Sequence, residues 1–367
     1  MTHFTYYNPV KIHFGVDIIQ KLPAFIKSRN ALVITSKGFK RRGTVDYIQS
    51  LSNRIVAIID NVKPNPTLAD VEEIYVSTNQ IQFDLIIALG GGSVIDVAKA
   101  ISVRPKSGSV NDLINIIKDN DCKLPYKITP IIAIPTTAGT GSEVTPWATI
   151  WDTKEMKKYS LHLKDLWCEA CVCDPILTQS LPKDITIQTG LDALSHAVEA
   201  VINVNANPIS NSYAIEATQE IITILPELVA DLDSIQLRSQ MMLASLKAGL
   251  AFSNTQTSIA HAISYYLTLH KSLPHGIACS ITLPDIIDLA IGVNDELDKE
   301  LFKMFGALSS VPMRKLFTKL QVSIDLRSYN ILKDDLLSIR ESLSHTSRAK
   351  NSILDVEGLF LKLESNV

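Results

Sequence analysis

Asp192 and His196 lie four residues apart in the stretch TGLDALSHAVEA, residues 189–200. The Leu, Ala and Val residues around them predict that this stretch forms the opening turns of a helix. Residues at positions i and i+4 lie one above the other on a helix, so the carboxylate and the imidazole can converge on one point. The pair could bind a metal ion or form only a local hydrogen bond, and further ligands are needed to decide between the two.

Two more histidines offer such ligands, His261 in SIAHAISYY and His275 in SLPHGIACS. Together with Asp192 and His196 they would supply one oxygen and three nitrogen ligands. This set suits a divalent transition metal and leaves room for a substrate oxygen. His270 lies between two of the proposed ligands in the sequence and is an intermediate case.

Two glycine-rich or hydroxyl-rich loops each follow an apolar strand, in DLIIALGGGSVIDVAKA (84–100) and in IPTTAGTGSEVT (134–145). Glycines let a backbone approach a phosphate, and the N-terminus of the following helix attracts an anion. Either loop alone could be an ordinary tight turn. Two such loops at the carboxyl ends of neighbouring strands predict a nucleotide site. The second loop offers the hydroxyls of Thr136, Thr137, Thr140 and Ser142.

The elements that must position these residues differ between the two halves of the chain. The first half alternates short apolar strands with helix-length segments, which predicts a parallel sheet covered on both faces. From about Leu181 the periodicity is helical, and Pro182 is expected to open the first long helix. We therefore predict an α/β dinucleotide-binding domain over residues 1–180 and an all-helical metal-binding and substrate domain over residues 181–367. The strands are expected at residues 31–35, 54–60, 83–90 and 129–137.

Composition narrows the possible partners of the 367-residue chain, which is 46% hydrophobic and long enough for two cores. Its net charge of −3 gives no electrostatic footprint for nucleic acid or for an anionic membrane surface. The amino terminus has no signal-peptide pattern and no stretch approaches a membrane span, so we expect a soluble cytoplasmic protein that binds small molecules. The cysteines of CEACVCDP (168–175) superficially suggest zinc, but no second ligand pair follows nearby and we interpret them as part of a buried strand.

The motifs GGGSVIDVAKA, PTTAGTGSEVT, TGLDALSHAVEA and PHG, with the isolated His261 between the last two, resemble the iron-containing alcohol dehydrogenase family. The resemblance covers nearly the whole chain. It implies the dehydroquinate synthase-like fold, at least a homodimer, and hydride transfer between NAD(P)H and a small aldehyde or ketone whose oxygen is polarised by Fe(II). The purified protein could carry Zn(II) or Ni(II) instead, because such a ligand set suits several divalent ions. The implied iron ligands are Asp192, His196, His261 and His275.

The same resemblance implies which residues line the dinucleotide site. They belong to the two loops and to one later position close to the nicotinamide. The implied residues are Gly91, Gly92, Ser93, Asp96, Thr136, Thr137 and Ser142 on the loops and Lys158 near the nicotinamide.

Two positions depart from the commoner family pattern. Many members carry a second histidine four residues after the third ligand, in a proton relay, where this chain has Tyr265. Tyr265, His270 or water are therefore the candidates for delivering the proton. Members that use NAD typically have an Asp after the Thr that ends the first strand, where this chain has Ser36. An Asp would repel the 2'-phosphate of NADP, so Ser36, beside the basic residues of SKGFKRRG, favours NADP(H) over NAD(H).

Three alternatives accompany this interpretation. A dehydroquinate synthase or a zinc glycerol dehydrogenase would share the fold, but the Asp-x-x-x-His pair and PTTAGTGSEVT argue against both. The stretch SYYLTLHKSLPHG resembles members of phosphonate metabolism, which makes a phosphonoacetaldehyde reductase the second candidate. A catalytically silent nucleotide-binding or assembly protein is disfavoured by the four-ligand set.

Overall fold

The computed structural model describes residues 3–343, 346 and 348–367, and within it the chain forms two compact units. The α/β unit consists of Asn8–Thr137 and Ser142–Thr178. The helical unit consists of Met1–Tyr7, Ala138–Gly141 and Gln179–Val367. The short segment Ala138–Gly141 therefore groups with the helical unit, which the sequence did not suggest.

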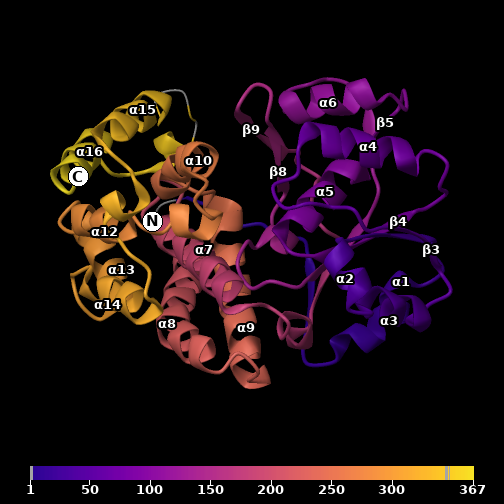
Figure 1. The fold of residues 1–367 in the computed structure, drawn as a ribbon, viewed down its shortest axis with the longest axis horizontal. Helices are drawn as coiled ribbons and strands as arrows, with labels where there is room; N and C mark the ends of the chain where they lie inside the picture. Colours follow the sequence, from indigo (N-terminus) through magenta and orange to yellow (C-terminus); the bar gives the residue numbers. More distant parts are fainter. Residues whose placement is uncertain (1–2, 344–345, 347) are drawn as a thin grey trace. The chain divides into compact units, whose positions relative to one another are not determined.

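The α/β unit is built on a sheet that, within the described residues, has six strands, all parallel, in the order β1-β10-β7-β4-β2-β3 (Figure 1). The predicted parallel sheet is thus confirmed, and the cysteine-rich segment is one of its buried strands. The strands span β1 Lys11–Phe14, β2 Ala31–Ile34, β3 Ile55–Ile59, β4 Leu85–Gly90, β7 Ile131–Pro135 and β10 Ala170–Cys173.

Helices cover both faces of this sheet. Side chains alternate between the faces of a strand, so Val33 and Ile87 pack against one helical layer while Leu32 and Ile86 are buried on the other face. Figure 1 shows helices on both sides of the sheet. The first layer contains η1 Ile18–Lys21, α1 Leu22–Ile26, α2 Lys37–Arg41 and α3 Thr44–Leu51, and the second contains α4 Leu68–Thr78, α5 Gly92–Ser102 and α6 Val110–Lys118.

The strand order changes direction between β2 and β4, because β3 lies outside β2 whereas β4 and β7 continue on its other side. Open α/β sheets bind ligands at the carboxyl ends of the strands at such a switch point. Ser36 follows β2 and Gly91 follows β4, so both lie at this edge. Two antiparallel pairs complete the unit: β5 Val103–Pro105 with β6 Tyr126–Ile128, and β8 Trp147–Asp152 with β9 Lys157–His162.

Long helices make up the second unit, in which α7 packs against both α8 and α9. Helix α7 begins at Lys183, just after Pro182, as predicted, so residues 189–200 do not form its opening turns but continue to one residue before its end at Val201. Among the described residues, none of the helices has the length and apolar character needed to span a membrane. The helices are α7 Lys183–Val201, α8 Pro208–Ala230, α9 Ile235–Thr255, α10 Ile259–Lys271, α11 His275–Ala278, α12 Leu283–Ala290, α13 Asp295–Phe305, α14 Val311–Leu320, α15 Lys333–Leu343 and α16 Val356–Ser365.

Candidate active site

Asp192 and His196 lie on a buried face of α7, where the side chains around them are Leu, Ala and Val. The helical period places both on one face, as predicted. The imidazole of His196 stacks on the Phe252 ring, with 4.0 Å between ring centroids, and on the imidazole of His261 at 4.5 Å. These contacts hold the His196 ring in one orientation.

His261 is held in place by Glu199 of α7. One carboxylate oxygen of Glu199 accepts hydrogen bonds from the backbone N–H groups of Ala260 (2.6 Å) and His261 (3.3 Å), at the start of α10. The other oxygen accepts from His261 Nδ1 at 2.5 Å. A proton on Nδ1 leaves the lone pair of Nε2 free to bind a metal, which is how a carboxylate commonly orients a metal-binding histidine. Sequence analysis missed Glu199, whose signal was a carboxylate three residues after His196 on an apolar face.

His275 reaches the site because α11 packs directly against α7 at Gly276. A Cβ atom on residue 276 would lie 1.8 Å from the carbonyl oxygen of Gln188. No side chain fits in that space, so glycine permits the close approach of the two helices. The side chain of His275 is 32% exposed, in contrast to the buried side chains of Asp192 and His261.

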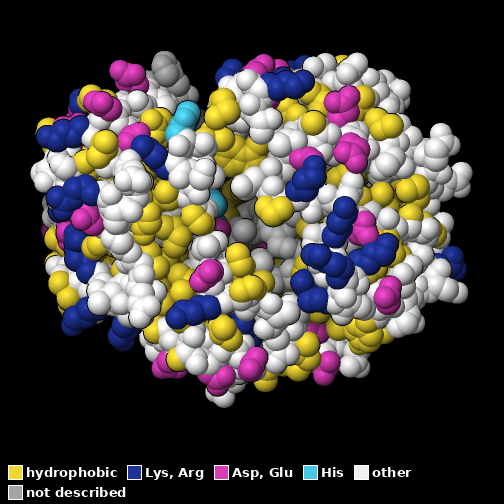
Figure 2. Space-filling model, viewed as in Figure 1, with side chains coloured by type: hydrophobic (Ala, Val, Ile, Leu, Met, Phe, Trp, Pro, Cys, Tyr) yellow, Lys and Arg dark blue, Asp and Glu magenta, His cyan; other side chains and the backbone are white. Residues whose placement is uncertain are grey.

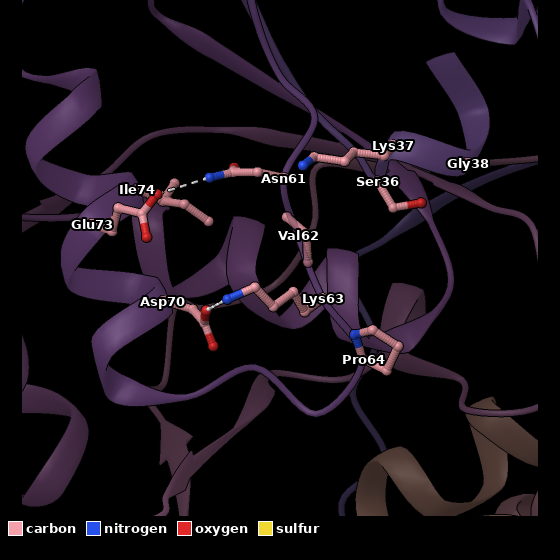
Figure 3. A pocket seen from close by; sticks show the side chains of 10 residues that line it. All are labelled: Ser36, Lys37, Gly38, Asn61, Val62, Lys63, Pro64, Asp70, Glu73 and Ile74. Carbon is pink, nitrogen blue, oxygen red and sulfur yellow. Dashed lines mark hydrogen bonds and ion pairs between the residues drawn. The ribbon is translucent and has the colours of Figure 1, made fainter. Parts of the chain in front are cut away.

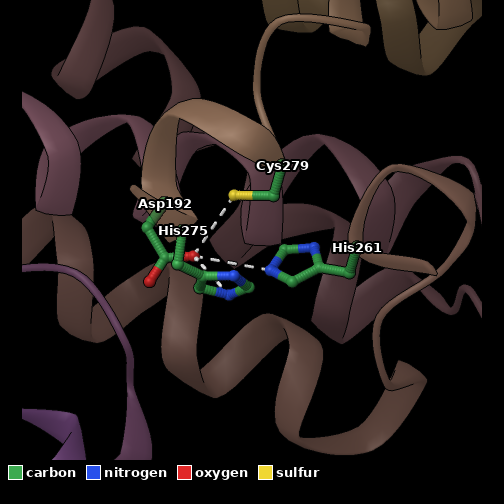
Figure 4. A group of neighbouring side chains, drawn as sticks. All are labelled: Asp192, His261, His275 and Cys279. Carbon is green, nitrogen blue, oxygen red and sulfur yellow. Dashed lines mark hydrogen bonds and ion pairs between the residues drawn. The ribbon is translucent and has the colours of Figure 1, made fainter. Parts of the chain in front are cut away.

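Three of the predicted ligands approach one oxygen of the fourth, Asp192, although His196 does not belong to the group of side chains whose ligand atoms all lie within 4.8 Å of one another. Its Oδ1 atom lies 3.4 Å from His261 Nε2, 3.8 Å from His196 Nε2 and 3.9 Å from His275 Nε2. Figure 4 shows the carboxylate, two of the imidazoles and the thiol of Cys279 facing one another. Ligand atoms of Asp192, His261, His275 and Cys279 all lie within 4.8 Å of one another.

This donor set fits a divalent metal ion. Two donors that share one ion at bond lengths of about 2.0–2.2 Å lie roughly 3.4 Å apart in a tetrahedral arrangement, which is close to the separations observed around Asp192. His261 Nε2 is buried and has no hydrogen-bond partner among the described residues. A buried polar atom without a partner is costly, and a metal ion would satisfy it.

The protonation states of His196 and Asp192 in the metal-free protein also suit a cation, whereas the raised pKa of His261 means that its imidazole must lose a proton when a metal binds. Burial lowers the pKa of His196 to about 3, which keeps its imidazole neutral. Burial alone would raise the pKa of Asp192, but the neighbouring His196, His261 and His275 hold it below the usual range, so Asp192 is an anion. Burial would lower the pKa of His261, but Glu199 and Asp192 raise it. A neutral imidazole and a carboxylate are the forms that bind metals.

The two candidates for proton delivery lie in different surroundings. Tyr265 is close to Glu199, Cys279 and Arg348, whose charges affect its pKa; burial makes the largest contribution and raises the pKa. The guanidinium carbon of Arg348 lies 5.5 Å from the centre of the Tyr265 ring. His270 packs instead against Tyr266, at 4.4 Å between ring centroids. Tyr265 therefore lies near residues that contact the metal ligands, whereas the ring of His270 packs against Tyr266.

At the sheet edge of the α/β unit, the two glycines that precede α5 are required by packing. A Cβ atom on Gly90 would lie 2.5 Å from the Val94 side chain, and one on Gly91 would lie 3.1 Å from Thr137. Gly91 is the N-cap of α5 and Gly92 its first residue, so the N-terminus of the helix begins at the predicted phosphate-binding turn. Close packing therefore accounts for the glycine at position 90, and the helix N-terminus at Gly91 suits an anion.

Asp96 and Ser142 interact with each other. The Ser142 hydroxyl donates to Asp96 at 2.6 Å, and the backbone N–H of Thr149 donates to the other Asp96 oxygen at 2.9 Å. The buried ammonium of Lys99 donates to the Ser142 carbonyl at 2.6 Å. These bonds hold the loop after β7, so Asp96 and Ser142 shape the sheet edge through the backbone that they fix.

The remaining predicted cofactor residues lie in varied positions. The hydroxyl of Ser93 accepts a hydrogen bond from the backbone N–H of Asn65 at 3.2 Å. Thr136 is buried. In the β8–β9 hairpin, the Lys158 ammonium lies 5.6 Å from the centre of the Trp151 ring. Thr140 belongs to the segment that groups with the helical unit. The other three hydroxyl residues of the second loop, Thr136, Thr137 and Ser142, group with the α/β unit.

Ser36 lines a pocket of about 370 Å³ at the carboxyl ends of β2 and β3 (Figure 3). Lys37, Asn61 and Lys63 also line it, and Lys63 pairs with Asp70 at 2.9 Å. Figure 2 shows basic side chains gathered over α2. Of the basic residues of this stretch, Lys37 lines the pocket. Lys40 pairs instead with Asp60 at 3.2 Å, and Arg42 stacks over Phe39.

Comparison with known proteins places the chain in one family. Residues 9–175 match the family model for iron-containing alcohol dehydrogenase, and residues 186–349 match the model for the C-terminal region of that family. The 1,3-propanediol dehydrogenase of Klebsiella pneumoniae is 31% identical over 83% of this chain and 79% of its own length. The long-chain-alcohol dehydrogenase 1 of Geobacillus thermodenitrificans is 34% identical over 82% of this chain and 76% of its own length.

Solved structures agree with these sequence relatives. Sulfoacetaldehyde reductase from Bifidobacterium kashiwanohense, determined in complex with NAD+, superposes with a TM-score of 0.89 at 27% identity, over 100% of this chain and 99% of that one. A 1,3-propanediol oxidoreductase superposes with a TM-score of 0.90 at 27% identity, over 100% of both chains. The chain belongs to the iron-containing alcohol dehydrogenase family, and it is an oxidoreductase.

Proposed function

We propose that the protein catalyses reversible, metal-dependent hydride transfer between NAD(P)H and the carbonyl carbon of a small aldehyde or ketone. The observation that carries this proposal is the convergence of three imidazole nitrogens on the carboxylate oxygen of Asp192. Asp192, His196, His261 and His275 would hold the ion, with Fe(II) as the physiological metal. When bound, such an ion acts as a Lewis acid that polarises the carbonyl oxygen and stabilises the negative charge developing there.

The residues of the chain prepare that site and supply the proton. Glu199 fixes the tautomer and orientation of His261, and the Asp192 carboxylate provides negative charge in a buried place. We assign delivery of the product's hydroxyl proton to Tyr265. Burial raises the pKa of this phenol, so at neutral pH it keeps a proton that it can donate. His270 is the weaker candidate because its ring packs on Tyr266.

NADP(H) is the proposed cofactor, with NAD(H) as a second possibility. The solved relative bound to NAD+ supports dinucleotide binding by the sheet edge, where Gly91, Gly92 and the N-terminus of α5 suit a pyrophosphate. Ser36 places no negative charge next to the ribose, and Lys37 faces the same pocket. At position 36 a 2'-phosphate would therefore meet no carboxylate and could pair with the Lys37 ammonium. The carboxylates that line the same pocket, Asp70 and Glu73, are held by Lys63 and Asn61.

A second candidate is the reduction of an aldehyde that carries an anionic group, such as phosphonoacetaldehyde. Arg348 favours it, because its guanidinium lies beside Tyr265 and is close enough to His196 to contribute to lowering the pKa of that imidazole. A phosphonate or sulfonate attached next to the aldehyde could pair with this cation. The structural likeness to a sulfoacetaldehyde reductase supports the same substrate class.

The proposal is tested with a panel of neutral and anionic aldehydes, each assayed with NADH and NADPH on protein loaded with Fe(II) or Zn(II). His261→Ala and His275→Ala are each expected to remove both bound metal and turnover while nucleotide binding persists. Retention of metal in both variants would dismiss the proposed ligand set. An Arg348→Ala variant separates the two substrate classes: it should lose anionic aldehydes selectively if they are the substrates.

A further inference from the structure

Cys279 places a thiol among the metal ligands, although sequence analysis did not consider it for this role. It lies four residues after His275, and its backbone N–H donates to the carbonyl of His275 at 2.9 Å. Its side chain is completely buried, and Sγ lies 3.5 Å from Asp192 Oδ1. Figure 4 shows the sulfur turned toward that carboxylate.

The backbone of Cys279 is fixed from α7. The hydroxyl of Ser195, which lies between Asp192 and His196 in the sequence, donates to the Cys279 carbonyl at 2.8 Å. The close packing of Gly276 on Gln188 holds the preceding turn of α11 against the same helix. The sulfur therefore occupies a defined position relative to Asp192, set by the helix that carries two of the other ligands.

The observed separations fit a shared ion. A thiolate binds zinc at about 2.3 Å and a carboxylate oxygen at about 2.0–2.2 Å, so sulfur and oxygen bound to one ion lie roughly 3.1–3.6 Å apart at the bond angles of four- or five-coordinate sites. The distance from Cys279 Sγ to Asp192 Oδ1 is 3.5 Å. His261 Nε2, buried and without a hydrogen-bond partner among the described residues, faces the same point.

We propose that Cys279 is a further metal ligand, so that the site binds its ion through sulfur as well as through nitrogen and oxygen. This inference rests on the metal site of the proposed function. On binding, a metal–sulfur bond forms, the S–H bond breaks and the proton passes to solvent, with no change in oxidation state. A thiolate makes the ligand set softer, which increases its preference for Zn(II) over harder ions such as Mn(II).

The competing explanation is that Cys279 stays a thiol and donates a hydrogen bond to Asp192, which the same 3.5 Å distance allows. Metal affinity does not separate these roles, because losing a hydrogen bond to a ligand also weakens binding by about 10–100-fold. A spectroscopic signal that requires a metal–sulfur bond does separate them.

The test uses the full chain loaded with Co(II), whose bond to a thiolate gives a charge-transfer absorption band in the near ultraviolet. We expect the wild-type protein to show this band and Cys279→Ser to lose it completely. Cys168→Ser is the matched control, because Cys168 is an equally buried thiol in the α/β unit, and this variant should keep the band.

X-ray absorption of the zinc-loaded wild-type protein provides a second measurement that needs no variant, and we expect one sulfur neighbour at about 2.3 Å. A Co(II) complex without the band, a band that persists in Cys279→Ser, or a zinc shell of nitrogen and oxygen alone would overturn the assignment. In those cases the metal site itself would stand. A wild-type protein that binds neither ion would refute the proposed metal site and this inference with it.

Discussion

Substitution of Gly276 by alanine should disrupt metal binding although glycine ligates nothing. The added Cβ would lie 1.8 Å from the Gln188 carbonyl oxygen, whereas ordinary contacts begin at 3.4 Å, so α11 must move away from α7 by about 1.6 Å. His275 begins this helix and would move with it. Metal–ligand distances tolerate only about 0.2 Å, so the shift removes His275 from the ligand set.

Overpacking of this kind costs about 1–3 kcal/mol, which a domain of this size can tolerate. We therefore expect Gly276→Ala to fold, as judged by circular dichroism, while its affinity for Zn(II) falls by at least about tenfold, as for changes to groups that orient a ligand. Competition with a chelator measures the affinity. Gly358→Ala is the matched control, because its Cβ would meet only the Asp355 side chain. Wild-type affinity in Gly276→Ala would show that the close approach of the helices does not position His275.

Three further predictions concern other parts of the chain. Glu199→Gln should weaken Zn(II) binding by about 10–100-fold, because the neutral amide holds the His261 Nδ1 proton less firmly; unchanged chelator competition would show that the contact is incidental. Ser36→Asp should shift the ratio of kcat/KM for NADPH over NADH by at least about tenfold toward NADH, equivalent to roughly 1.4 kcal/mol, and an unchanged ratio would mean that the ribose is recognised elsewhere. Light scattering should show a dimer or larger oligomer, with the edge strand β1 as the candidate contact; a monomer at working concentration would contradict this.

Part of the site could be predicted from the sequence because it depends on local periodicity. Asp192 and His196 share a face of α7 because the helical repeat requires it, and the apolar neighbours indicate that this face is buried. The glycine-rich turn after β4 could also be predicted from the sequence, because an apolar strand, three glycines and a helical segment follow one another directly. The start of α7 was visible from Pro182, because proline is common where a helix begins, and α7 does begin at Lys183.

The tertiary structure alone decided which side chains meet. Glu199 and His261 are 62 residues apart in the sequence, and Cys279 and Asp192, whose Sγ and Oδ1 atoms lie 3.5 Å apart, are separated by 87 residues. A local sequence pattern therefore could not predict either contact. Asp96 and Ser142, which the family resemblance implies line the cofactor site, also form a hydrogen bond with each other that fixes their loop, and this contact could not be read from the sequence. Sequence periodicity determines which face of a helix or strand is buried. The packing of the helices determines what that face contacts, and here it depends on Gly276, which leaves room for the carbonyl group of Gln188.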